Sequence, residues 1–149
     1  DRIAAQPFAT HLMIYVASED QSLYAYERST GRQRWRYFAE DPLNTTPVAI
    51  GDLVFIDVPE KGLVALDTIN GNPRWTSKDL AGAKPLHMRG EYLYMFLNRT
   101  MMIISRTDGL TISEFNMPKV DDVFMDNAKD GNMYLMNSTI GRIMKLTPR

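Results

Sequence analysis

The sequence predicts an all-β protein, a partial β-propeller of about four four-stranded blades with the last blade incomplete. Residues 22–35 (SLYAYERSTGRQRW) and 62–75 (GLVALDTINGNPRW) superpose without a gap at a spacing of 40. Short apolar, β-branched and aromatic runs bounded by turn residues indicate antiparallel strands. No 11-residue window carries the i, i+3, i+4 stripe of a helix. Four strands in every ~40–45 residues is the period of a propeller blade.

Each repeat is predicted to hold a proline-led strand, an apolar strand, an Ala- or Ile-centred strand and a Trp-bearing strand. The third and fourth strands are separated by the turn pairs Thr30-Gly31, Asn70-Gly71 and Asp108-Gly109, in which glycine adopts a positive φ without steric cost. We therefore expect one domain over residues 1–149, with blades at about 5–38, 45–77, 84–116 and 120–149.

The later repeats depart from the pattern. Residues 100–109 (TMMIISRTDG) follow at a spacing of 38 but lack the tryptophan, and residues 142–147 (RIMKLT) stop before any glycine. The fourth blade is therefore expected without its outer strand. An open ring exposes strand edges, which are aggregation hazards. The ring is closed by a second polypeptide, or the chain is part of a larger protein, or four blades close alone. We favour closure by a second polypeptide. This includes the case of an identical copy, which would give eight blades.

The tryptophans are predicted to pack blades together, because Trp35 and Trp75 occupy the same place in the fourth strand of their repeats. In a strand, alternate residues face opposite ways. The arginines that alternate with Trp35 (Arg32, Arg34 and Arg36) are therefore expected on the other face of an outer edge strand. The structural repeat residues that we predict are Gly31, Trp35, Gly71, Trp75 and Gly109.

Residues 65–75 (ALDTINGNPRW) resemble the A-x-D-x-x-x-G-x-x-x-W pattern of the PQQ-like repeat, and residues 25–35 match it with Glu27 in place of the aspartate. The resemblance implies a propeller. The family includes quinone-dependent dehydrogenases, BamB-type lipoproteins of outer-membrane assembly and sensor ectodomains of membrane kinases. Because a fold does not dictate a function, the site residues must decide among these.

Composition and motifs argue against several chemistries. The chain has no cysteine and a formal net charge of −1, so cysteine-ligated metals, cysteine nucleophiles and bulk attraction to nucleic acid are not expected. The loop at residues 126–131 has Ala128 where a calcium loop needs an oxygen ligand, and Lys129 adds a positive charge. His11 and His87 fall in different blades. We predict no cofactor, no metal site, no catalytic residues and no transmembrane segment.

These observations favour a non-catalytic protein-interaction or scaffold module, similar to BamB-type propellers and located outside the cytoplasm, in the periplasm or secreted. The alternatives are a fragment of a quinone-dependent dehydrogenase and a ligand-sensing ectodomain. The expected partner is another protein or a second copy that completes the propeller. Strand addition is expected at the free edge of the fourth blade, at Arg142, Ile143, Met144, Lys145 and Leu146. Rim contacts are expected from loops 19–21, 59–61, 98–99 and 137–139.

Overall fold

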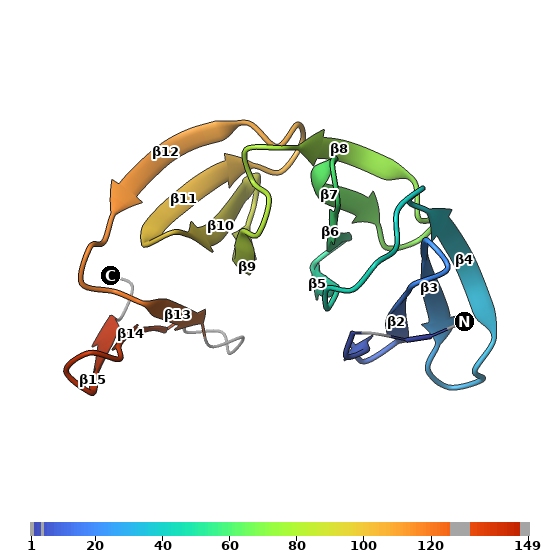
Figure 1. Ribbon diagram of the computed structural model, residues 1–149, viewed down its shortest axis with the longest axis horizontal. Helices are drawn as coiled ribbons and strands as arrows, with labels where there is room; N and C mark the ends of the chain where they lie inside the picture. Colours follow the sequence, from blue (N-terminus) through green and yellow to red (C-terminus); the bar gives the residue numbers. More distant parts are fainter. Residues whose placement is uncertain (1, 4, 126–131, 147–149) are drawn as a thin grey trace. The chain divides into compact units, whose positions relative to one another are not determined.

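The computed structural model describes residues 2–3, 5–125 and 132–146, and within these the chain is all-β. Four antiparallel sheets follow one another in chain order, three with four strands and the last with three (Figure 1). No helix occurs among the described residues. This architecture confirms the predicted partial β-propeller. The chain divides into two compact units, residues 1–82 and 83–149, with two blades each.

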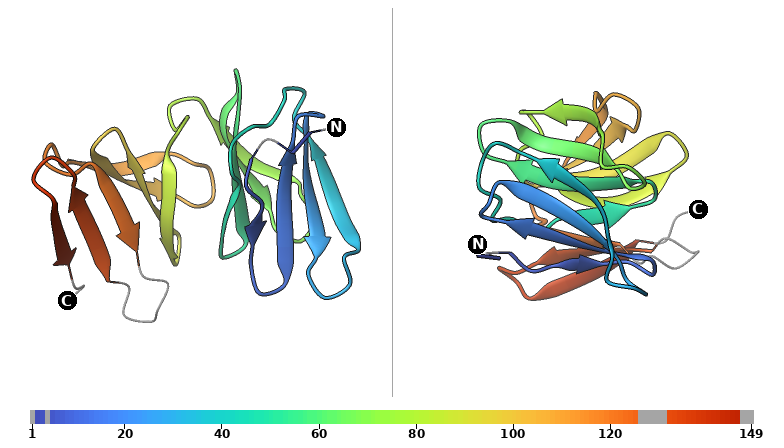
Figure 2. Two further views of the ribbon diagram at one scale, coloured as in Figure 1. Left: turned by 60° about the horizontal axis from the view of Figure 1, so that its bottom comes forward. Right: turned by 90° about the vertical axis from the view of Figure 1, so that its right-hand side faces the viewer.

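The first unit contains the first and second blades. Each blade is a simple meander in which sequential strands pair as neighbours (Figure 2). The first blade has the strands β1 (Phe8–Ala9), β2 (Met13–Ser18), β3 (Ser22–Glu27) and β4 (Gln33–Phe38). The second has β5 (Val48–Ile50), β6 (Leu53–Val58), β7 (Gly62–Asp67) and β8 (Pro73–Ser77).

The second unit contains the third and fourth blades. The third blade has the strands β9 (Lys84–Arg89), β10 (Tyr92–Leu97), β11 (Thr100–Ser105) and β12 (Thr111–Asn116). The fourth has β13 (Asp122–Met125), β14 (Met133–Asn137) and β15 (Arg142–Leu146). A strand corresponding to the Trp-bearing one is absent from the described part of the fourth blade.

A tryptophan docks the first blade onto the second. Trp35 of β4 is buried in a cluster that joins the two sheets, and its Nε1 donates a 2.9 Å hydrogen bond to the backbone oxygen of Thr68. The indole lies over Gly71, where a Cβ atom would come within 2.5 Å of the Trp35 ring. Only a glycine permits this approach, and its φ of 73° also favours glycine.

Asp67 builds the turn that receives the indole. One carboxylate oxygen accepts the backbone N–H groups of Ile69 and Asn70, and the other accepts the guanidinium of Arg74. The N–H of Gly71 closes the turn on the Asp67 carbonyl. The hydrogen bond from Arg74 lowers the pKa of Asp67 below its usual value, and the two backbone N–H groups act in the same direction. The repeat aspartate therefore shapes the docking surface.

The second unit has its own core, between the third and fourth blades. Leu86, Phe96 and Met101 of the third blade pack with Val123 and Leu135 of the fourth. At the edge of this core, Lys84 of β9 forms a 2.8 Å ion pair with Asp122 of β13, and its ammonium group lies 4.0 Å from the centre of the Phe124 ring. An ammonium over an aromatic ring adds a cation–π attraction to the ion pair.

Every outer strand of the first three blades carries a bulge at the same place. In the first blade Ala25 pairs with Trp35 and Tyr26 with Gln33, which leaves Arg34 as the extra residue. Arg74 and Ile112 occupy the same position in the next two blades. A bulge re-aims the side chain of the extra residue. Along β4, Arg34, Trp35 and Arg36 are exposed, buried and exposed in turn, as the expected alternation has them, and Arg32 precedes the strand.

The tryptophan contact predicts different outcomes for alanine at two glycines. Gly31 has a φ of 69°, but no atom lies within 4 Å of the place where a Cβ would stand, so Gly31→Ala incurs only backbone strain of about 1–2 kcal/mol. Gly71→Ala adds the clash with Trp35 and is expected to lose about 1–3 kcal/mol more. Denaturant unfolding of the two variants measures the difference. Equal losses would contradict the docking role.

The aspartate turn predicts a pH-dependent stability. The folded-state pKa of Asp67 is lowered, so its stabilisation is present above the unfolded pKa of about 4 and is lost as pH falls through the folded pKa. Asp67→Asn is expected to cost about 1–3 kcal/mol at pH 7, because the side chain is only 7% exposed. The difference in free energy of unfolding between the wild type and this variant should narrow below about pH 4. Exposed Asp79→Asn is the control, and a gap that stays constant down to about pH 2 would refute the assignment.

Candidate protein-interaction surfaces

The predicted repeat residues lie in the scaffold. Trp35 and Gly71 form the docking contact described above, and Trp75 is buried with its ring 5.9 Å from that of Phe55 in the same blade. Gly31 and Gly109 stand in turns closed like that of Gly71, each with a positive φ and an N–H donated to the carbonyl four residues earlier. Gly31 is exposed, so the turn of the first blade has a free face.

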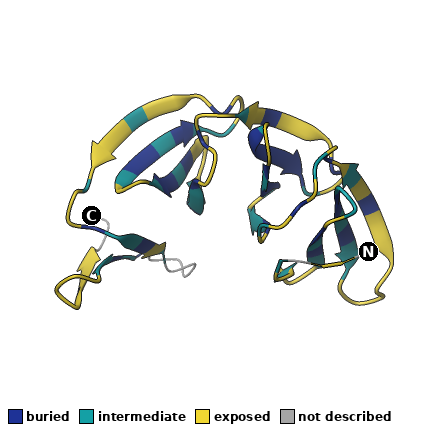
Figure 3. Ribbon diagram, in the orientation of Figure 1, coloured by how far each residue is buried: buried dark blue, intermediate teal, exposed yellow. Residues whose placement is uncertain are grey.

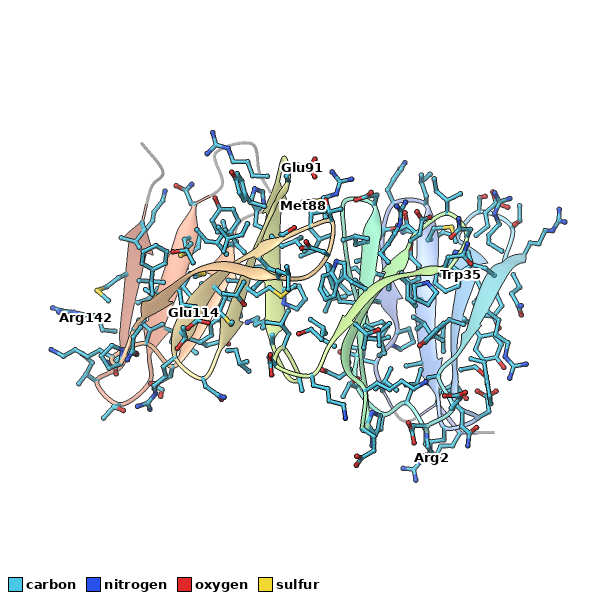
Figure 4. The ribbon with its side chains drawn as sticks, turned by 90° about the horizontal axis from the view of Figure 1, so that it is seen from above. Arg2, Trp35, Met88, Glu91, Glu114 and Arg142 are labelled. Atoms are coloured by element: carbon cyan, nitrogen blue, oxygen red, sulfur yellow. The ribbon has the colours of Figure 1, made fainter. Side chains whose placement is uncertain are left out.

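The fourth blade ends, among the described residues, on a strand that is exposed throughout. β15 pairs with β14 alone, and all five of its residues are exposed (Figure 3). The corresponding third strands β3, β7 and β11 are buried or half-buried along their whole length. Ile143 is 68% exposed and Leu146 48%. Arg142, labelled in Figure 4, begins this strand.

The two faces of β15 differ in chemistry. Met144 and Leu146 lie in register with Leu135 and Met133, on the face that carries the core of the second unit. Ile143 and Lys145 lie on the opposite face, because side chains alternate along a strand. Apolar groups are therefore open to solvent on both faces of the strand, next to a backbone edge that no other described strand pairs with.

The predicted rim loops of the first unit are held by local polar contacts. In loop 19–21, the Asp20 carboxylate accepts a 2.6 Å hydrogen bond from the Tyr24 hydroxyl. The N–H of Ala39 bonds the Gln21 carbonyl, and the neighbouring Glu40 pairs with Lys61 of loop 59–61 at 2.6 Å. The segment at residues 39–40 thus connects both loops, in contacts that no motif of the sequence indicates.

Asp121 joins the two rim loops of the second unit. One oxygen accepts a 2.9 Å hydrogen bond from Arg99, and the other accepts the N–H and hydroxyl of Ser138 at 2.8 and 2.6 Å. The bonds from Ser138 lower the pKa of Asp121, and Arg99 adds to the effect. Loops 98–99 and 137–139 therefore form one surface. The sequence offers no local signal for it, since the partners are 17 and 22 residues away.

The remaining candidates are dispersed. His11 is exposed in the first blade, and His87 lies beside Tyr94 within the sheet of the third. The acidic loop at residues 126–131 lies outside the described residues. No group of three or more histidine, cysteine or acidic side chains capable of holding a metal occurs in the part of the chain described. The described residues also include no helix that is long and apolar enough to cross a membrane.

Comparison with solved structures identifies the fold. BamB from Moraxella catarrhalis superposes on 97% of this chain with a TM-score of 0.65 at 15% identity, and the chain spans 52% of that structure. The computationally designed Ika4 protein superposes with a TM-score of 0.66 at 8% identity, over 99% of this chain and 92% of its own. Quinohemoprotein alcohol dehydrogenase from Comamonas testosteroni superposes with a TM-score of 0.59 at 14% identity, over 99% of this chain and 33% of its own.

Sequence comparison supplies the family. No curated protein matches the sequence. The family profile described as outer membrane protein assembly factor BamB matches residues 3–113. That range contains both well-preserved repeats, and it covers most of the chain. With its four meander blades and its docked tryptophan, the chain therefore belongs to the BamB family of outer membrane protein assembly factors, as the resemblance of its repeats implied.

Proposed function

We propose that this chain is a non-catalytic protein-interaction module that acts outside the cytoplasm, in the manner of a BamB-type scaffold. The observation that carries the proposal is the exposure of β15 on both faces, where the three equivalent strands are covered. Family membership supports the cellular setting, since the family is named for outer-membrane protein assembly. The partner of the strand is another protein, and a second copy of this chain is the one we favour.

The proposed mode of binding is strand addition. A strand with one unpaired edge presents a row of free N–H and C=O groups, and an incoming strand satisfies them while its side chains occupy alternate positions. Ile143, Met144 and Leu146 supply exposed apolar surface to such a strand. Pairing of β15 with β14 keeps the ordering cost of binding low, because the receiving strand is already extended.

Charge on β15 is expected to prevent association. The double variant Ile143→Lys, Leu146→Lys places two like charges along the free strand, which blocks edge pairing. Light scattering over a dilution series should show a self-associated wild type and a monomeric double variant. Leu110→Lys is the matched control, because Leu110 is 66% exposed in the same unit but precedes β12. Protection of the β15 amides from hydrogen exchange in the associated form alone would support strand pairing.

The test also has outcomes that count against the proposal. A wild-type chain that remains monomeric at high concentration would exclude the second copy as the partner. Equal dissociation of the Leu110→Lys control would show that the charge acts generally and not at β15. Slow exchange of the β15 amides in the monomer would show that the strand is already covered.

The rival function is quinone-dependent alcohol oxidation, since a quinohemoprotein alcohol dehydrogenase shares the fold. We expect that the chain, incubated with pyrroloquinoline quinone and Ca²⁺ and then gel-filtered, retains no quinone absorbance and reduces no dye with ethanol. Lysozyme carried through the same steps is the control for trapped quinone. Stoichiometric retention of the quinone together with dye reduction would establish the enzyme instead.

A further inference from the structure

A groove of about 500 Å³ lies between the first and second blades, within the first unit. We name it the interblade groove and define it by His11, Leu12, Tyr15, Arg34, Thr68 and Ile69. Its volume falls within the range of about 300–1,000 Å³ typical of ligand sites. It lies next to the docked tryptophan, whose indole is bonded to Thr68 and whose ring centre is 5.8 Å from that of Tyr15.

Two large aliphatic side chains border the interblade groove. Leu12 of the first blade is 69% exposed, and Ile69, in the turn of the second blade, is 78% exposed. Exposed apolar surface beside a concavity is typical of an interaction site. Both residues lie in segments bonded to their own blade: the Leu12 carbonyl accepts the N–H of Arg28, and the Ile69 N–H is held by Asp67. The borders of the groove are therefore preorganised.

The groove also has an unneutralised positive charge. No acidic side chain lines it, whereas Arg34 does. Arg34 is the extra residue of the bulge in β4, and its counterpart Arg74 pairs with Asp67 in the second blade. The residue that corresponds to Asp67 is Glu27, and its carboxylate instead accepts the Thr30 hydroxyl at 2.8 Å. Among the residues described, Arg34 has no ion-pair partner.

Tyr15 also lines the groove. Tyr15 is buried, and burial raises its pKa to about 12. Tyr15 is therefore neutral near pH 7, as an ordinary tyrosine is, and brings no negative charge to the groove. A ligand that satisfies this arrangement has a carboxylate for Arg34 and an apolar body for Leu12 and Ile69.

We infer that the interblade groove binds a peptide segment of a partner protein in which an acidic side chain lies beside a large apolar one. Arg34 receives the carboxylate through a charge-assisted hydrogen bond, and Leu12 and Ile69 enclose the apolar side chain. The choice of a peptide as the ligand rests on the proposed protein-binding function. The site itself is independent of β15, which belongs to the other unit.

The test is a titration of the whole chain with four capped pentapeptides that place Phe or Leu next to Asp or Glu between glycines. Trp35 adjoins the groove, so its fluorescence reports occupancy, and calorimetry gives the affinity. At least one peptide should bind, and its Asn or Gln analogue should bind about tenfold more weakly, as expected for loss of one charge-assisted hydrogen bond. Arg34→Ala should produce a similar loss, and high salt should weaken binding.

Controls separate the groove from general attraction and from misfolding. Arg32→Ala removes an equal charge from the exposed turn just before β4 and should leave the affinity unchanged. Ile69→Asn should weaken the Phe and Leu peptides while leaving thermal unfolding nearly unchanged. Arg34→Lys retains the positive charge but lacks the two parallel N–H donors of a guanidinium. Its affinity for the peptides should lie between those of the wild type and of Arg34→Ala.

Several outcomes would overturn the inference. These are no binding by any of the four peptides, equal binding of the amide analogues, and equal weakening by Arg32→Ala and Arg34→Ala. Binding of decanoate in their place would assign the groove to a fatty acid. The β15 double variant should bind the peptides normally. Self-association tests the strand-addition proposal, and peptide binding tests the groove. Either proposal can therefore fail while the other holds.

Discussion

The contact between Trp35 and the turn at Thr68–Gly71 is the constraint on which the first unit depends. It joins two sheets that share no backbone hydrogen bonds between strands, and it requires a bare glycine and a correctly placed carbonyl at once. Asp67 holds the glycine and the carbonyl in place, because its carboxylate accepts hydrogen bonds from two backbone N–H groups of the turn. The same turn carries Ile69 at the border of the interblade groove. The turn that receives the indole therefore also forms part of the groove surface.

The second unit joins its blades by other means. The register pairs Ile103 with Ser113, where the first blade pairs Ala25 with Trp35, so no indole is available from β12. Methionine, phenylalanine and leucine side chains fill the space between the sheets, and two aspartates, Asp121 and Asp122, connect the blades through Arg99 and Lys84. Partly exposed ion pairs contribute little individually, so the apolar cluster provides most of the stabilisation.

The two proposed binding surfaces work by different physics. At β15 the affinity comes from backbone groups that need partners, and side chains matter mainly for the surface they bury. In the interblade groove the affinity comes from the guanidinium of Arg34 and from the apolar side chains of Leu12 and Ile69. Both depend on rigid sheets, because strands that are already ordered lose little conformational entropy on binding. A propeller of meander sheets can therefore present several separate interaction sites.

The sequence by itself determined the local pattern: the period near 40, the meander strands, the glycine turns and the tryptophan that docks the first blade onto the second. Each of these features depends on residues close together in the sequence. Apolar–polar alternation and turn residues therefore indicate them directly. Among the described residues the fourth blade has three strands, as the shortened fourth repeat predicted. Only the tertiary structure decided that Asp121 connects two loops and that the borders of the groove come from two blades. These features join residues far apart in the chain, and no local pattern encodes such contacts.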